Sequence, residues 1–339
     1  MTPRRTRERG AALLLAMLTV ALVAMFAAAA LWQQWRSVEV ETAERARIQS
    51  GWILTGALDW ARLLLREDQM GAGANGADHL GEPWAVPLQE ARLSSFLAAD
   101  KNNTSTDLTP DVMDAFLSGQ IIDQASLMNV NNLVSEGGQL NQAWVDAFGR
   151  LFEILGLPQS ELDKMVENLR FSIAAAVNPP SPPQVPLRPQ RVSDLVWLGV
   201  SPQTVAALEP YVTVLPEPTL VNANTASAEV IAAAGGLDLS EGQRLVQVRN
   251  AQYFSSKTAI LAQLNRGAAG APTGQGDLLT INSRFFEVRS RLRLDKLVVE
   301  ERAIVQRDGA GPTTVVKVLR RERGTVDPTA MSQIAMSQR

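Results

Sequence analysis

The sequence contains no cysteine and only one histidine, and both scarcities restrict the chemistry that the protein can perform. Without cysteine, disulfide bonds and thiolate metal sites are excluded. The histidine, His79, lies in the stretch GAGANGADHLGEP and has no second histidine or cysteine with which to build a zinc site or a nucleophile–base pair. We therefore expect His79 to be a solvated loop residue.

Common catalytic motifs are missing as well. The sequence has no G-x-S-x-G, Walker A or H-E-x-x-H pattern, and no pair of carboxylates stands out as a general acid and base. The net charge of −3 and the pI of about 5.5 give no global indication of nucleic-acid binding. We expect a protein that is not an enzyme and that needs no cofactor.

A long uncharged segment lies close to the start of the chain. No residue from Gly10 to Trp35 is charged, and the apolar run Ala11–Leu31 is long enough as a helix to cross a hydrocarbon layer of roughly 30 Å. The positive-inside rule places the basic head in the cytoplasm and the rest of the chain outside. The arginines of this head are Arg4, Arg5, Arg7 and Arg9.

Three interpretations of this segment compete. AAAA at 27–30 could end a cleaved signal peptide, although the apolar run is long for one. The segment could also be a plain signal anchor. The third interpretation starts from the junction ERG–AALLL, where glycine ends the basic head and the apolar run begins at once.

This junction resembles the class III signal of type IV pilins and type II secretion pseudopilins. The resemblance implies that a prepilin peptidase cuts after Gly10 and methylates the new amino terminus at Ala11. Most pilin-like subunits carry glutamate at mature position five, where this chain has Leu15. In that family the minor pseudopilin K characteristically lacks this glutamate, as expected of a subunit at the tip of the fibre.

Periodicity predicts the elements that follow. Residues 37–67 contain no proline and repeat small or apolar residues at helical spacing, so the membrane helix should continue. One strand is expected within 118–134. A meander is expected from 285 to 323, with turns at 295–296 and 308–311. Alternation in FFEVRSRLRL puts Val288 on the buried face and Arg289 on the wet face.

The region 136–280 has helical patterns and should be an insertion. Its first lobe contains one helix with Trp144 and Phe148 on the apolar face and a second helix capped by Ser160. The second lobe resembles two helix-hairpin-helix modules, with Thr225 or Ser227 as an N-cap. In DNA-binding versions the hairpin amides hold phosphate, whereas here Asp238 and Glu241 flank the second turn, so a protein-contact role is favoured.

Together these patterns predict an α+β fold: a pilin-like long N-terminal transmembrane helix, an antiparallel sheet and a large all-α insertion. The expected divisions are a leader (1–10), a transmembrane helix (11–35), the first part of the pseudopilin domain (36–135), the insertion (136–280, with lobes 136–177 and 191–265 and a Pro-rich linker 178–190), the C-terminal strands (281–323) and a tail (324–339).

NVNNL at 129–133 and NANTA at 222–226 resemble the N-L-N-N-L and N-I-N-T-A segments of K-type pseudopilins, in the same order along the chain. The resemblance implies a single-pass inner-membrane protein with a large periplasmic domain. Such a protein caps a short pseudopilus together with the minor pseudopilins I and J and supports export through the outer membrane. Its other partners would be the prepilin peptidase and the inner-membrane secretion platform.

Two alternatives stay open. DKNNTSTDLTPD at 100–111 places Asp100, Asn102 and Asp111 near EF-loop offsets, but its sixth residue is not glycine and its last is not glutamate. A solvated turn is the expected role of this loop, and a calcium site the weaker one. The runner-up function is a membrane-anchored periplasmic DNA-uptake protein that uses the helix-hairpin-helix lobe.

Overall fold

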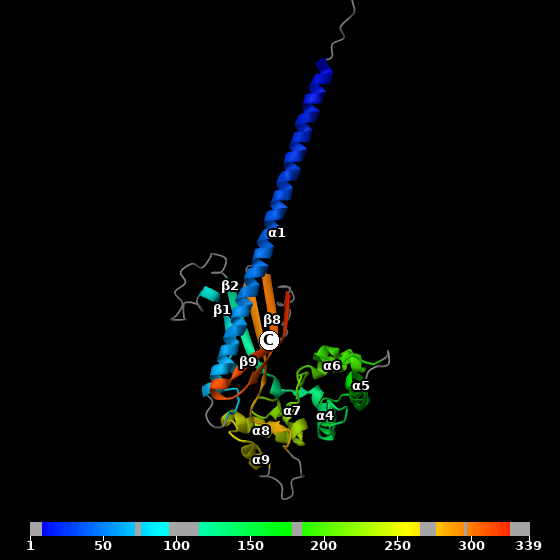
Figure 1. Ribbon diagram of the computed structural model, residues 1–339, viewed down its shortest axis with the longest axis vertical. Coiled ribbons are helices and arrows are strands. Elements are labelled where there is room, and N and C mark those ends of the chain that lie inside the picture. The colour runs from blue at the N-terminus through cyan, green and yellow to red at the C-terminus, as the bar shows by residue number, and fades with distance from the viewer. Residues whose placement is uncertain are drawn as a thin grey trace, which may run out of the picture. The chain divides into compact units, whose positions relative to one another are not determined.

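The computed structural model describes residues 9–71, 76–94, 115–177, 185–264, 276–294 and 297–325. The chain forms two compact units, Met1–Thr55 and Gly56–Arg339, and the helix α1 (Arg9–Gly71) passes from the first into the second (Figure 1). No proline interrupts its 63 residues, so the backbone hydrogen bonding can continue without a break. The prediction that the helix continues past the apolar run is confirmed.

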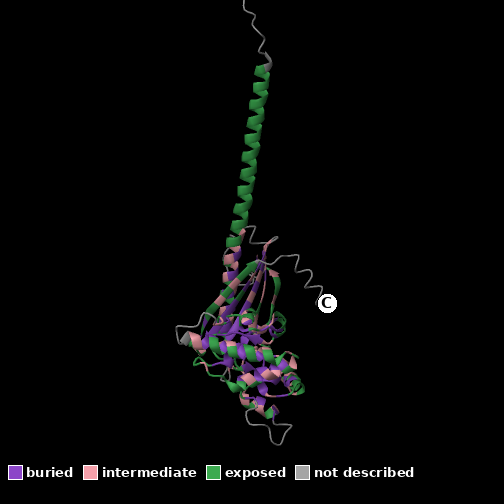
Figure 2. Cartoon of the chain, turned by 90° about the vertical axis from the view of Figure 1, so that its right-hand side faces the viewer, coloured by how far each residue is buried: buried purple, intermediate pink, exposed green. Residues whose placement is uncertain are grey.

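The first unit consists of the N-terminal part of α1. Residues 11–35 are exposed on every face of the helix, as the green ribbon in Figure 2 shows. Among the described residues, this is the one helix long and apolar enough to cross a membrane. The first charge after the apolar run, on Arg36, lies over the ring of Trp32 at 5.8 Å.

A five-stranded antiparallel sheet in the order β1-β2-β7-β8-β9 forms one part of the second unit. The expected C-terminal meander is confirmed. The strand expected within 118–134 stops at Asp123, because that side chain accepts a hydrogen bond from Ala125 N and starts a turn. The strand β1 was missed. The strands are β1 (Leu88–Arg92), β2 (Ala115–Asp123), β7 (Phe285–Leu294), β8 (Leu297–Asp308) and β9 (Val315–Thr325).

The last turns of α1 pack on one face of this sheet. Leu58, Ala61 and Leu65 share an apolar core with Phe286 and Val288 of β7. The predicted alternation is confirmed from Val288, which is buried, and Arg289, which is partly exposed. It is wrong for Glu287, which was expected on the wet face with Arg289 and is buried. Two arginines of the opposite face are paired, Arg289 with Glu287 and Arg293 with Glu90.

The insertion carries its predicted helices around one core. Trp144 and Phe148 are buried as expected. Ser160 lies inside the first turn of its helix rather than at the N-cap, because Glu161 N already donates to Pro158 O. The elements are α4 (Gln142–Ile154), α5 (Gln159–Val177), η4 (Val192–Leu198), α6 (Pro202–Leu208), α7 (Ala228–Gly235), α8 (Leu239–Ala251) and α9 (Lys257–Leu264).

Both predicted hairpins turn at a glycine in the left-handed region, Gly199 with φ 85° and Gly236 with φ 66°. Ser227 is the N-cap of α7, and its side chain accepts from Val230 N. Thr225 has a different role, described below.

Two short parallel strand pairs were not predicted, and with them the region 136–280 is not helical throughout. One pair joins β3 (Met128–Asn129) to β4 (Val212–Thr213). The other joins β5 (Val221–Asn222) to β6 (Leu279–Thr280). Each strand has only two residues, which is too short for an alternation of apolar and polar side chains to be visible in the sequence.

Candidate functional site

The expected processing site lies at the start of α1. Gly10 and Ala11 are both helical, and the side chain of Leu15 is 64% exposed on the helix surface. An apolar side chain therefore stands where the resemblance places a carboxylate. Cleavage after Gly10 and methylation of Ala11 remain predictions.

The candidate calcium loop lies outside the described residues. Asp100, Asn102 and Asp111 all fall in the range 95–114, so a calcium site there also remains a prediction.

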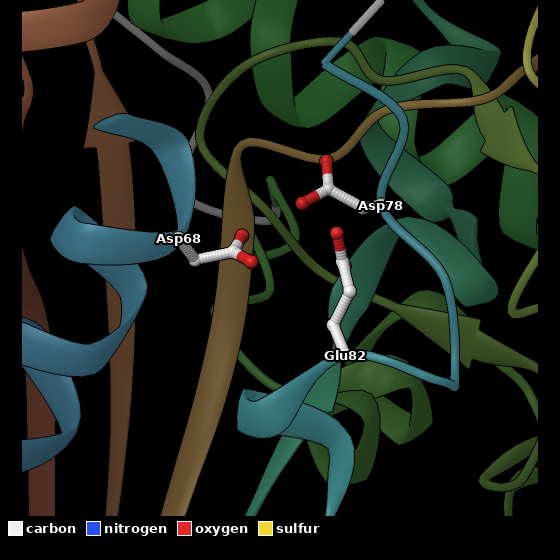
Figure 3. Close-up of side chains that lie close together, drawn as sticks. All are labelled: Asp68, Asp78 and Glu82. Carbon is white, nitrogen blue, oxygen red and sulfur yellow. The ribbon is translucent and has the colours of Figure 1, made fainter. Parts of the chain in front are cut away.

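A carboxylate cluster that the sequence did not reveal lies where α1 ends. Asp68 comes from α1, while Asp78 and Glu82 come from the loop that leads to β1. Oxygen atoms of the three side chains lie within 4.8 Å of one another, and the carboxylates point into the same space (Figure 3). Three acids at this spacing repel one another while ionised.

Arg307 of β8 supplies the positive charge of this cluster. Its guanidinium donates to Asp68 Oδ2 at 2.9 Å, to Asp78 Oδ1 and to Ser283 O at 3.0 Å. The residue is only 3% exposed and its guanidinium lies 4.8 Å from the centre of the Phe286 ring. Burial nevertheless raises the pKa of Asp78 to about 6, because the loss of hydration outweighs the attraction of Arg307.

No lysine or arginine among the described residues forms an ion pair with Glu82. Its Oε2 accepts from His79 N at 2.9 Å and from Trp84 Nε1 at 2.7 Å. Burial, and then the charges of Asp68 and Asp78, raise the pKa of Glu82 to about 7 against the two hydrogen bonds. This carboxyl therefore titrates near neutral pH.

His79 is not the solvated loop residue that we expected. Its ring stacks on Tyr253 with centroids 3.9 Å apart, and its side chain is only 20% exposed. Nδ1 accepts from Gly81 N at 3.1 Å, so the neutral ring carries its proton on Nε2. Burial lowers the pKa of His79. The ring thus helps to join the 76–87 loop to the segment after α8.

The spacing of Asp68, Asp78 and Glu82 would suit a divalent cation, but donors of the chain itself hold them. Arg307 binds the two aspartates, and two N–H groups bind Glu82. The cluster is better explained as an internal charge network than as an open metal site.

A second buried acid connects the helical insertion to the sheet through hydrogen bonds. Asp123, at the end of β2, is 3% exposed. Its Oδ2 accepts from Asn222 Nδ2 at 3.0 Å, from Thr225 Oγ1 at 2.5 Å and from Ser283 Oγ at 2.6 Å. Burial raises the pKa of Asp123, while these donors favour its ionised form.

The asparagines of NVNNL (129–133) and NANTA (222–226) form hydrogen bonds with backbone groups of neighbouring loops. Asn129 Oδ1 accepts from Asn131 N and Leu215 N, and Asn132 exchanges two hydrogen bonds with the backbone of Thr219. Asn224 exchanges two more with the backbone of Phe254. These side chains pair buried backbone groups of loops that have no strand partner.

In both hairpins, backbone N–H groups at the start of the second helix already donate to carboxylates of the chain itself. At α6, Glu161 Oε2 accepts from Ser201 N at 2.9 Å, which lowers the pKa of Glu161. At α8, Asp238 and Glu241 form a reciprocal capping box. A phosphate placed at either hairpin would meet a carboxylate rather than free amides, which weighs against DNA binding.

Comparison with known proteins finds similarity to one family. Two sequence models, both described as "Type II secretion system (T2SS), protein K", match residues 126–217 and 221–282. Both segments are similar to the protein K family of type II secretion systems. Each matched segment contains one of the parallel strand pairs, β3 with β4 in the first and β5 with β6 in the second.

Two known proteins are similar to this chain over most of its length. The type II secretion system protein K of Pseudomonas aeruginosa is 25% identical over 339 residues, covering 94% of each chain. A chain in the crystal structure of the GspK-GspI-GspJ complex from the type 2 secretion system of enterotoxigenic Escherichia coli is 18% identical. That match has a TM-score of 0.62 and covers 83% of this chain and 98% of the other, so the expected α+β fold is confirmed.

Proposed function

We propose that this protein is a minor pseudopilin that caps the tip of a type II secretion pseudopilus and supports protein export through the outer membrane. The match to a protein K along 94% of both chains carries the proposal. The uncharged, exposed part of α1 supports anchoring in the inner membrane. The arginines before it favour a cytoplasmic amino terminus and a periplasmic globular part.

The position at the tip is argued from two features. Leu15 cannot form the carboxylate–amine pairing that would link it to a subunit above it. The segments between β2 and β7 add a helical body to the pilin-like sheet, and this bulk would hinder docking of a further subunit. The role is non-catalytic, with assembly through the membrane helix and through contacts of the globular part.

The proposed partners are inferred from the structurally similar chain. Its crystal structure holds a GspK-GspI-GspJ complex, and we propose that the corresponding minor pseudopilins I and J bind this chain. The prepilin peptidase would cleave the chain after Gly10, and the inner-membrane secretion platform would assemble the fibre.

The first experiment is to determine the mature amino terminus by mass spectrometry after expression with and without a prepilin peptidase. We expect a peptidase-dependent start at N-methylated Ala11. A start near Leu31, or an intact Met1 in both strains, would contradict processing as a pseudopilin.

DNA uptake remains the alternative function, and the occupied hairpins weigh against it. We expect no binding of a fluorescent DNA duplex by the full chain in detergent at low salt, measured by anisotropy. Binding that weakens steeply as salt is added would favour the alternative.

A further inference from the structure

The cluster around Arg307 joins segments that are far apart in the sequence. Arg307 Nη1 donates to Leu65 O of α1 at 3.4 Å, and Ser283 N, just before β7, donates to Asp78 Oδ2 at 2.7 Å. From the insertion, Asn222 Nδ2 donates to Asp78 O at 3.1 Å. Asp78 N donates to Ile281 O at 2.9 Å. We call the 76–87 loop with these contacts the junction.

The junction contains more negatively than positively charged groups. Three carboxylates, those of Asp68, Asp78 and Glu82, lie within 4.8 Å of one another, and a single guanidinium contacts two of them. His79 Nε2 lies 4.0 Å from Glu82 Oε1, and burial lowers the pKa of His79, which disfavours a positive charge on this ring. The remaining acid nearby, Asp123, adds negative charge. Near neutral pH the cluster would therefore carry an excess of negative charge out of water, which a bound proton would relieve.

Glu82 is the group best placed to take that proton. Asp78 and Asp68 both accept from Arg307, whereas Glu82 accepts from two neutral N–H groups through Oε2 alone. Its Oε1 is thus the oxygen on which a proton can sit. A hydroxyl there can donate to a neighbouring carboxylate, so repulsion is replaced by a hydrogen bond.

We propose that Glu82 is a proton-binding site that makes the junction between the sheet and the helical insertion tighter as the surroundings become more acidic. The pH dependence itself does not depend on the proposed function, whereas its link to external pH rests on the periplasmic location proposed above. Because the periplasm equilibrates with the medium, the site would couple the packing of the insertion to external pH.

The sign of the effect follows from linkage. The pKa of Glu82 is about 7 in the folded chain against 4.5 in a free side chain, so the folded state holds the proton more tightly than the unfolded state. The folded state therefore gains stability as pH falls from above 7 towards 4.5. Asp78, with a pKa of about 6 against 3.8, contributes in the same direction at lower pH.

The experiment follows urea unfolding of the full chain in an uncharged detergent, with EDTA present, from about pH 8 to about pH 6.5. We expect the midpoint for the wild type to rise as pH falls in this window, and the rise to be absent in Glu82→Gln, which keeps the size and the acceptor oxygen. In Asp68→Asn, which removes a like charge, the rise should move to lower pH. Glu153→Gln, an exposed glutamate of α4, is the matched control and should behave as wild type.

Hydrogen exchange of residues 78–86, corrected for its intrinsic pH dependence, reports on the junction itself. It should slow in acid for the wild type and not for Glu82→Gln. An unchanged rise of the midpoint in Glu82→Gln would overturn the proposal. A parallel series replaces EDTA by calcium. A calcium-dependent rise at about pH 7.5 that Glu82→Gln abolishes would also overturn the proposal, since the cluster would then be a metal site.

Discussion

Asp123 Oδ2 accepts a hydrogen bond from Ser283 Oγ at 2.6 Å, and this contact joins the residue at which the chain leaves the sheet to the residue just before it returns. Asn222 and Thr225 donate to the same oxygen from the middle of the insertion. One buried carboxylate therefore joins the two crossings between the sheet and the insertion to the middle of the insertion.

Asp123→Asn should destabilise the fold by about 2–4 kcal/mol, because an amide presents an N–H group to donors that need an acceptor. Urea unfolding at neutral pH is the measurement. Asp163→Asn, an exposed position on α5, is the control and should change the free energy of unfolding by less than about 0.5 kcal/mol. Equal effects of the two substitutions would show that Asp123 does not hold the crossing.

Arg307→Met should cost about 3–5 kcal/mol, since it leaves Asp78 buried without its cation while nearly preserving the side-chain volume. Arg302→Gln tests the same strand at an exposed position and should have little effect. A combined Arg307→Met and Asp78→Asn chain should recover part of the loss. If the combined chain is no more stable than Arg307→Met alone, the buried pair is not the cause.

Periodic features of this protein could be predicted from the sequence. The apolar run predicted α1, and the alternation around Val288 predicted β7. Both signals are local, because one face of an element repeats along the chain. Ser227 was likewise visible as one of two candidate N-caps, since capping requires particular residue types.

Long-range contacts were not predictable in this way. Asp68, Asp78 and Arg307 meet only after α1 packs on the sheet, and no spacing in the sequence marks them as neighbours. The role of His79 could not be predicted for the same reason, because the ring on which it stacks, Tyr253, lies far away in the sequence. NVNNL was visible as a motif in the sequence. Only the structure shows that its buried asparagines form hydrogen bonds with backbone groups of loops.

Leu15→Glu tests the position at the tip. A carboxylate in the membrane helix costs about 2.5–3.5 kcal/mol unless it is paired. In a subunit that terminates the fibre we expect no gain in assembly or secretion. Leu18→Glu is the control for the cost of inserting the charge. Secretion of an exported enzyme and the position of the subunit by immunogold labelling are the measurements. Incorporation of the Leu15→Glu protein along the fibre would contradict capping.

Gly149 and Gly242 are both glycines inside helices, of α4 and of α8, and they should respond in opposite ways to alanine. At Gly149 an added Cβ would meet its nearest atom at 3.9 Å, an ordinary contact. Gly149→Ala should therefore stabilise the fold by about 0.5–1 kcal/mol through helix propensity. At Gly242 the Cβ would lie 2.4 Å from Ala228 O, so α7 and α8 would have to separate.

Gly242→Ala should accordingly destabilise by about 1–3 kcal/mol, as overpacking does in a close contact between helices. Urea unfolding of the two variants, measured side by side, checks both signs with the same substitution. Because helix propensity favours alanine at both positions, only the close approach of α7 and α8 can reverse the sign at Gly242. A stabilising Gly242→Ala would mean that the two helices pack less closely than 2.4 Å implies.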